Sequence, residues 1–289
     1  MRLVQYRAKE GIRLGVYTSG QVLDVASAAM KAGKDPAKFA STLALLEAGD
    51  EAMAFVRGLD AERDGEKIEE ARLEYPVAAR KIVAIGLNYR DHAEEAKLPI
   101  PKSPLCFAKF TSSLNGPFDA IRLPEPDANV DWEGELGVVI GRRAHRVSQA
   151  EAVECVAGYV AFNDVSERRW QFADGQWTRG KSCDTFSPNG PYLVTRDEVP
   201  DPGNLRITTR INGEVMQDSS TKQLIFGIAE IISFLSRAFT FEAGDIIATG
   251  TPPGVGFSRK PPRFLQAGDV VEVEIERIGK IANRVERGN

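Results

Sequence analysis

The sequence predicts an α+β protein made mainly of β-strands, in which a small β/α unit precedes a larger, strand-rich unit. Three observations support this. Short apolar runs separated by Gly, Pro and Asp dominate from Lys81 onward, helical periodicity is confined to a few stretches, and a charged segment divides the chain near residue 75. With 289 residues, 43% of them hydrophobic, the chain can fill a sizeable core.

Residues 1–75 are expected to form the small unit. Strands are predicted over LVQY, IRLGVYT and QVLDVAS, the last two joined by a turn at Ser19-Gly20. Apolar residues recur at helical intervals over residues 35–59, which predicts two short helices broken near Gly49. The segment DAERDGEKIEEARLEY has few apolar anchors and is expected to be a linker.

Residues 76–289 are expected to form the larger unit. Its predicted strands lie in the runs KIVAIGL, GELGVVIG, CVAGYVAFND, LRITTRING, DIIATG and DVVEVEIERIG. Helices are predicted around residues 88–97, 167–172 and 221–239.

Charge and composition exclude several classes of protein. The chain has 41 acidic and 37 basic residues and lacks a basic stripe, so nucleic acid is not expected as a partner. The amino-terminal residues lack the apolar core of a signal peptide, and no run approaches the ~20 apolar residues of a membrane span, so a cytoplasmic location without membrane contact is expected. Cys106, Cys155 and Cys183 match no disulfide or zinc pattern and are interpreted as packing residues.

The run VDWEGELGVVIG places Glu133 and Glu135 on one face of a predicted strand. Salt bridges to neighbouring strands are one explanation for such a pair. However, Gly134 between the two acids suggests that another group comes close to the strand, and the apolar residues that follow indicate entry into a core. Paired carboxylates are costly there unless a divalent cation neutralises them.

A third carboxylate is expected nearby, because hard cations such as Mg²⁺ and Mn²⁺ prefer several oxygen ligands. Asp164, at the end of the apolar run GYVAFND, is the best candidate. A helix N-cap for the following SERRW is its alternative role.

Histidine offers a second chemical group. The chain has two histidines, His92 and His145, and no zinc-binding cluster. His92 lies three residues before Glu95 in a predicted helix, an arrangement in which the carboxylate orients the imidazole as a base that activates water. A surface His–Glu pair without a catalytic role is the alternative, and His145 is expected to be exposed.

Further polar residues stand in unusual contexts. Arg168 and Gln171 would share one helical face with Asp164 and could surround a ligand. Lys181 and Thr251 lie in loops rich in Gly and Pro, which by themselves are weak signals because such loops are usually turns. Nucleotide-binding glycine motifs are absent.

From about Lys81 to its end, the chain resembles the fumarylacetoacetate hydrolase family. The resemblance rests on the ordered segments GLNYRDHAEE, DWEGELGVVIG, FNDVSERRWQ, GKSCDTFSPNGP, NGEVMQDSST and AGDIIATGTPPGVG. It implies the family's mixed β-sandwich or roll as the catalytic fold, with residues 1–75 as a variable amino-terminal domain.

The resemblance also implies roles for the site residues. Glu133, Glu135 and Asp164 would hold one Mg²⁺ or Mn²⁺ per subunit, and His92 with Glu95, on a mobile lid helix, would activate water. Lys181 would stand beside the developing oxyanion. Arg168 and Gln171 would orient the substrate, and Thr251 would touch it.

Fumarylacetoacetate hydrolase itself has a further acidic ligand seven residues before its histidine, where this chain has Ile85. The pattern is closer to a bacterial branch that acts on acylpyruvates and related 2,4-dioxo acids, including sugar-derived 2,4-diketo-3-deoxy acids. The expected activity is therefore metal-dependent C–C bond hydrolysis of a small-molecule dioxo acid in a homodimer. Oxaloacetate decarboxylation and 2-hydroxyhepta-2,4-diene-1,7-dioate isomerisation are alternatives on the same site, and a non-catalytic binding protein is a remote one.

Overall fold

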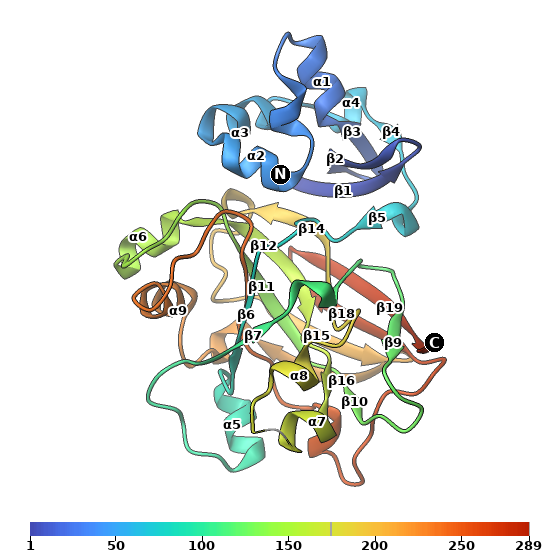
Figure 1. Ribbon diagram of the computed structural model, residues 1–289, viewed down its shortest axis with the longest axis vertical. Coiled ribbons are helices and arrows are strands. Elements are labelled where there is room, and N and C mark those ends of the chain that lie inside the picture. Colours follow the sequence, from blue (N-terminus) through green and yellow to red (C-terminus); the bar gives the residue numbers. More distant parts are fainter. Residues whose placement is uncertain (174, 289) are drawn as a thin grey trace.

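The computed structural model describes residues 1–173 and 175–288. Figure 1 shows a small unit from the start of the chain, drawn in blue, above a larger unit. A long mixed sheet of 12 strands runs through both units, and a second sheet of five strands lies in the larger one. The predicted α+β class with a mainly β larger unit is confirmed.

The small unit pairs an antiparallel sheet with short helices. Its elements include β1 (Arg2–Ala8), β2 (Gly11–Thr18), β3 (Gln21–Asp24), α1 (Val25–Lys31), α2 (Thr42–Ala48), α3 (Asp50–Arg57) and α4 (Ala61–Asp64). The three predicted strands and the helix pair around Gly49 are confirmed. The third strand is shorter than predicted, because the Asp24 carboxylate accepts a hydrogen bond from Ser27 N at 2.7 Å and starts α1 there.

The charged segment before residue 75 is not the free linker that was predicted. It contains α4 and two short strands, β4 (Glu66–Lys67) and β5 (Leu73–Glu74), which pair with β3 and β1. Leu73 supplies an apolar anchor, since it is buried. β1 also pairs with β14 (Ser187–Thr195) of the larger unit, so the sheet is continuous across the predicted boundary. The position of the boundary near residue 75 stays a prediction.

The large sheet has the strand order β4-β3-β2-β1-β14-β12-β11-β17-β6-β7. Its remaining strands are β6 (Ile82–Gly86), β7 (Leu105–Lys109), β11 (Gly134–Ile140), β12 (Val156–Asn163) and β17 (Ile246–Ala248). β8 (Leu114–Asn115) pairs with β14 outside this path. Every residue of β11 is buried, so this strand crosses the core as its apolar sequence predicted.

The second sheet packs against β11 and β12. Its order is β16 (Glu214–Ser220), β15 (Arg206–Ile211), β18 (Val270–Ile275), β19 (Gly279–Arg287) and β9 (Ile121–Leu123). A short ladder joins β10 (Val130–Asp131) to β13 (Ser166–Glu167). All six runs predicted as strands in the larger unit contain a strand.

The larger unit also contains α5 (Arg90–Ala96), α6 (Gln149–Glu154), α7 (Arg168–Ala173), α8 (Thr178–Lys181) and α9 (Ile228–Leu235). The helix predicted over residues 221–239 is much shorter than expected. The Asn88 side chain bonds to both the N–H and the C=O of Phe226, and these bonds hold the chain before α9 out of a helix.

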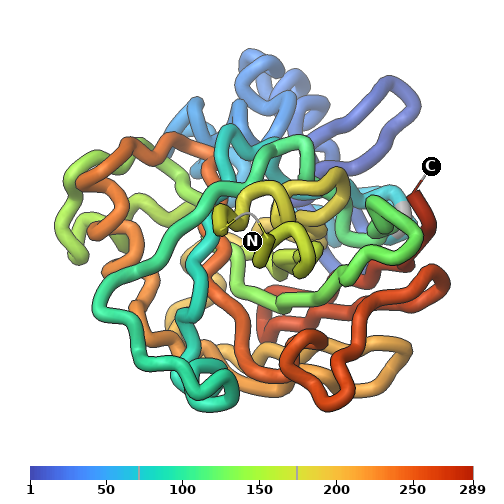
Figure 2. Tube along the Cα trace, turned by 60° about the horizontal axis from the view of Figure 1, so that its bottom comes forward, coloured from blue at the N-terminus to red at the C-terminus, as the bar shows by residue number. Residues whose placement is uncertain are grey.

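The two ends of the larger unit differ. α5, α7 and α8 lie at the end away from the small unit, at the bottom of Figure 1, and they come forward in Figure 2 while the small unit recedes. Arg168 of α7 and Lys181 of α8 there contact Glu133, the residue directly before β11. Within the described residues, no helix has the length and apolar character needed to cross a membrane.

Candidate metal centre and active site

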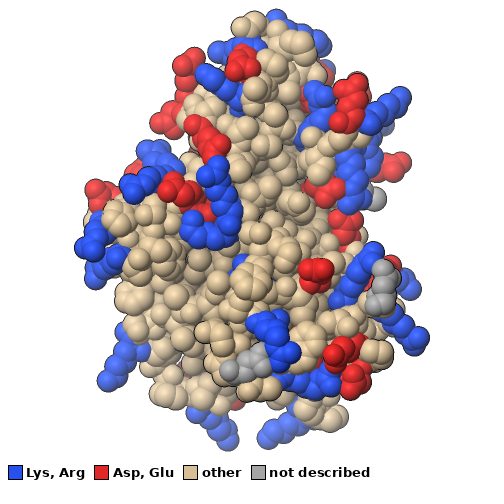
Figure 3. All heavy atoms as spheres, in the orientation of Figure 1, with Lys and Arg blue, Asp and Glu red and all other residues tan. Residues whose placement is uncertain are grey.

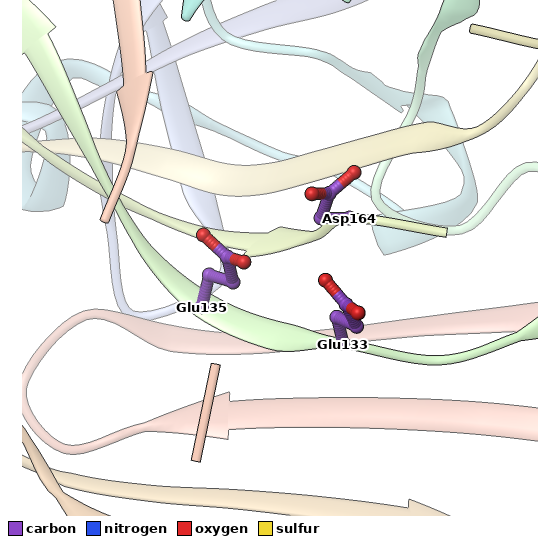
Figure 4. A group of neighbouring side chains, drawn as sticks. All are labelled: Glu133, Glu135 and Asp164. Atoms are coloured by element: carbon purple, nitrogen blue, oxygen red, sulfur yellow. The ribbon is translucent and has the colours of Figure 1, made fainter. Parts of the chain in front are cut away.

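Three carboxylates meet where β11 begins and β12 ends. Antiparallel pairing sets Gly134 opposite Asn163, and this register brings the flanking acids side by side. Carboxylate oxygens of Glu133, Glu135 and Asp164 lie within 4.8 Å of one another, and the three side chains point toward one another in Figure 4. The structure thus brings together the three residues that the sequence predicted as a cluster.

Buried cations neutralise two of these acids. Lys181 Nζ donates to Glu133 Oε2 at 2.6 Å and to Asp164 Oδ2 at 2.9 Å. Arg168 Nη2 lies 2.6 Å from Glu133 Oε1, and Lys109 Nζ lies 2.6 Å from Asp164 Oδ1. Although burial opposes ionisation, Lys181 and Arg168 lower the pKa of Glu133 to about 2.

Glu135 is in a different electrostatic state. Its Oε2 accepts a hydrogen bond from Gly250 N at 2.7 Å. Burial raises its pKa well above the ordinary value, and the nearby charges of Asp164 and Glu133 raise it further. In the absence of another cation, this carboxyl group therefore retains a proton more readily than Glu133 does.

The donor set fits Mg²⁺ or Mn²⁺. All three groups offer carboxylate oxygen, they are buried, and they converge from two adjacent strands. Ile85, on β6, is apolar and buried, so its position supplies no fourth acid.

His92 and Glu95 lie together on α5, as their spacing predicted. His92 Nδ1 lies 3.3 Å from Glu95 Oε2, and His92 is only 8% exposed. The hydrogen bond from His92 lowers the pKa of Glu95, and Gly254 N donates to the same carboxylate at 3.1 Å. Asp91 anchors the helix through Ser219 Oγ at 2.5 Å. A carboxylate placed in this way fixes the orientation of the imidazole.

Arg168 is fully engaged by the protein. Its Nε and Nη2 both contact Asp131, at 2.9 and 2.8 Å, while Nη1 donates to Gln171 Oε1 at 2.8 Å. Its guanidinium also lies 4.6 Å from the centre of the Phe257 ring. The predicted contact of Arg168 and Gln171 with substrate stays a prediction, whereas their contact with each other is observed.

One local prediction needs correction: Lys181 ends the short helix α8 rather than lying in a loop. The alternative role of Asp164 as a helix N-cap is not observed, since Glu167 accepts a hydrogen bond from Trp170 N at 2.6 Å at the start of α7. Thr251 lies in the predicted loop, where its Oγ1 donates to Gly134 O at 2.9 Å.

Three site residues escaped the sequence analysis: Lys109, Asp131 and Gln217. Lys109 had a usable signal, because it alternates with buried Phe107 in the strand LCFAK and so falls on the core-facing side. Asp131 accepts from Arg168 and from the N–H of Gly256, which lies 125 residues away in the chain. No pattern in the sequence around Asp131 predicts such a contact.

Comparison with known proteins supports the family assignment. The family model for the carboxy-terminal domain of fumarylacetoacetate (FAA) hydrolase matches residues 81–286. The chain belongs to the fumarylacetoacetate hydrolase family. The predicted catalytic fold of this family is therefore confirmed, as is the resemblance to its bacterial branch.

Proteins similar to this chain are named for different activities. The mitochondrial oxaloacetate tautomerase FAHD2A of Homo sapiens is 43% identical over 99% of this chain and 91% of its own length. A 2-hydroxyhepta-2,4-diene-1,7-dioate isomerase from Mycobacterium marinum superposes with a TM-score of 0.77 at 33% identity, covering 100% of this chain and 99% of its own. A maleylpyruvate hydrolase from Sphingobium sp. SYK-6, solved with manganese(II) and pyruvate, superposes with a TM-score of 0.82 at 30% identity, covering both chains fully.

We predict that Glu135→Gln stabilises the metal-free protein at neutral pH. The folded-state pKa of Glu135 lies above its ordinary value of 4.5, so the folded protein binds this proton more tightly than the unfolded chain. Stability contributed by the bound proton is lost as pH rises from about 4.5 through the raised pKa. Thermal unfolding in EDTA from pH 5 to 8 should show this loss in the wild type and not in Glu135→Gln, a difference of about 1 kcal/mol or more at the upper end.

Glu133→Gln is the matched control, because the pKa of Glu133 is lowered and its ionised form is stabilising. It should unfold at a lower temperature than the wild type at neutral pH. Equal pH dependence in the wild type and Glu135→Gln would contradict the electrostatic interpretation.

Proposed function

We propose that this protein is a Mg²⁺- or Mn²⁺-dependent enzyme that forms enolates of 2-oxo acids, with keto–enol tautomerisation of oxaloacetate as its main reaction. The observation that carries the proposal is the buried cluster of Glu133, Glu135 and Asp164, together with the His92–Glu95 pair on α5. The choice of oxaloacetate is supported by the full-length similarity to an oxaloacetate tautomerase.

The charge of the site supports an anionic substrate. Within the described part of the chain, the buried centre sets the acids Asp131, Glu133, Glu135 and Asp164 against the cations Lys109, Arg168 and Lys181. With all seven groups ionised, negative charge exceeds positive charge by one. A divalent cation reverses this balance to one positive charge, which the carboxylate of a 2-oxo acid neutralises.

Glu133, Glu135 and Asp164 would hold the Mg²⁺ or Mn²⁺, which would supply Lewis-acid stabilisation of the negative charge that develops on the substrate. His92, oriented by Glu95, takes the proton from C3 of oxaloacetate. The electron pair of that C–H bond becomes the C2–C3 double bond, the π pair of the carbonyl moves onto the oxygen on C2, and transfer of the proton from His92 to this oxygen completes the enol. Lys181 offsets the negative charge on this oxygen until the oxygen is protonated.

Hydrolysis of a 2,4-dioxo acid is the second candidate, favoured by the His92–Glu95 pair. His92 would take a proton from water as the water oxygen attacks the distal carbonyl. The C–C bond then breaks, its electron pair passes into the pyruvate enolate, and C3 gains a proton. Lys181 would stabilise the intermediate alkoxide. Acylpyruvates and 2,4-diketo-3-deoxy acids are the proposed substrate classes for this reaction.

Oxaloacetate decarboxylation and isomerisation of 2-hydroxyhepta-2,4-diene-1,7-dioate would use the same enolate. The predicted contacts of Arg168, Gln171 and Thr251 with a substrate carboxylate or carbonyl belong to this proposal. Metal-dependent turnover of any of these acids would rule out the remote alternative of a non-catalytic binding protein.

We predict that His92→Ala lowers the rate of oxaloacetate tautomerisation about 10²- to 10⁴-fold, the usual contribution of a general base. The reaction would be monitored by the absorbance of the enol with Mn²⁺ present. The same preparations would be assayed for hydrolysis of an acylpyruvate and for release of CO₂ from oxaloacetate. Mn²⁺ affinity should stay unchanged, since His92 is not one of the three carboxylates. Wild-type rates in His92→Ala, or turnover that is unaffected by EDTA, would contradict the proposal.

We also propose that the protein is a homodimer that pairs through the edge strand β7. Large apolar side chains are exposed before, within and directly after this strand: Leu98, Ile100, Leu105 and Phe110. The face in Figure 3 carries few charged side chains over this region. An unprotected apolar edge strand is a favourable site for pairing with a second chain.

Light scattering after gel filtration should give twice the 31.6 kDa monomer mass. Leu105→Asp places a charge on β7 and should yield monomers, because Leu105 is 48% exposed in the single chain. Val215, 49% exposed on the edge strand β16, provides the matched control Val215→Asp, which should stay dimeric. A monomeric wild type would contradict the proposal.

A further inference from the structure

The loop from Gly250 to Gly254 joins the two halves of the candidate active site. At its start, Gly250 N donates to Glu135 Oε2 at 2.7 Å; at its end, Gly254 N donates to Glu95 Oε1 at 3.1 Å. One short stretch of backbone therefore holds a carboxylate of the acidic cluster and the carboxylate that orients His92. Any displacement of this loop changes the spacing between the two.

Gln217 fixes the middle of this loop. It lies on β16 in the second sheet and is 1% exposed. Its Nε2 donates to Thr251 Oγ1 and to Pro252 O, both at 2.8 Å, and its Oε1 accepts from Gly134 N at 3.0 Å. A single side-chain amide thus ties the loop to the residue between the two glutamates of β11.

The second sheet lies very close to the backbone at Gly134 and Gly254, the two glycines beside Gln217. A Cβ on Gly134 would lie 2.3 Å from Thr209 Oγ1 on the second sheet. Gly254, with φ +99°, would place a Cβ 2.0 Å from Met216 O. Glycine at both positions lets β16 approach the strand and the loop directly.

A β-bulge directs Gln217 toward this contact. Thr209 pairs with Gln217, but the next residue, Arg210, pairs with Val215, so Met216 is the extra residue on β16. Bulges of this kind turn a strand locally and re-aim its side chains. The irregularity therefore lies directly beside the residue that makes the three bonds.

We propose that Gln217 is a positioning residue that sets the distance between the metal-binding carboxylates and the His92–Glu95 pair. It acts through Gly134 and the 250–254 loop rather than through the substrate. Hydrogen-bonding partners of metal ligands commonly change metal affinity about 10- to 100-fold when they are removed. This inference rests on the proposed function only in that the acidic cluster binds a divalent cation.

The first test is calorimetric titration of metal-free protein with Mn²⁺, without substrate. Gln217→Met keeps the side-chain length and removes all three hydrogen bonds, so Mn²⁺ should bind about tenfold more weakly or worse. Thr209→Val is the matched control, since Thr209 also packs on Gly134 but its buried Oγ1 has no hydrogen-bond partner in the described structure. It should bind Mn²⁺ as the wild type does.

The loop end of the clamp gives an independent test. Thr251→Val removes the hydroxyl that accepts from Gln217 and donates to Gly134 O, and should weaken Mn²⁺ binding about as much as Gln217→Met. The double variant should be no worse than either single variant, because both break the same connection. Thr251→Ser keeps the hydroxyl and should restore wild-type affinity. If Gln217→Met does not fold, the two Thr251 variants decide the question.

At saturating Mn²⁺, Gln217→Met should lower kcat for oxaloacetate tautomerisation about tenfold or more with little change in KM, because the loop also positions Glu95. Wild-type Mn²⁺ affinity in both Gln217→Met and Thr251→Val would overturn the inference, even if both variants melt earlier. Failure of the wild type to bind Mn²⁺ would overturn it as well. If the wild type binds Mn²⁺ but converts no 2-oxo acid, the proposed function fails, and the titrations alone decide the role of Gln217.

Discussion

Three carboxyl groups, none more than 8% exposed, can all be ionised within 4.8 Å of one another only where cations lie beside them. The required cations come from separate parts of the chain: Lys109 from the end of β7, Arg168 from α7 and Lys181 from α8. Removing one partner of such a buried pair typically costs about 3–5 kcal/mol. The positions of these three elements around the ends of β11 and β12 are therefore tied to the charge of the site.

The sequence was sufficient to predict the acids but not their neutralisation. Alternation along a strand places Glu133 and Glu135 on one face, and the end of the next apolar run supplies Asp164, so the cluster follows from local rules. Lys109 reaches the site from β7, the edge strand of the large sheet, and Gln217 reaches it from the second sheet. Such contacts depend on how sheets pack, and a single sequence carries no direct record of that packing. For the same reason the paired short strands within the charged segment before residue 75 were missed.

The structure also explains the glycine between the two acids. The sequence indicated only that some group approaches Gly134; that group is the second sheet, through Thr209 and Gln217. Thr251 and Arg168 illustrate a related point, because the family resemblance implied that both contact the substrate. In the structure their polar atoms bond to Gly134, Asp131 and other protein groups, so their first effect is to hold the site together.

Tautomerisation, decarboxylation and C–C hydrolysis share an enolate, so the carboxylate cluster by itself does not select among them. In the proposed mechanisms, the difference lies in whether His92 takes a proton from a C–H bond of the substrate or from a water molecule. α5 carries His92, and it is attached to β16 through Asp91 and Ser219, to Leu224 O through Arg90, and to the glycine-rich loop through Glu95. His92 is only 8% exposed on the helix that these contacts hold. Under the proposed function, the choice of reaction therefore depends on how α5 is held against the 250–254 loop and β16, the same contacts that Gln217 and its neighbours organise.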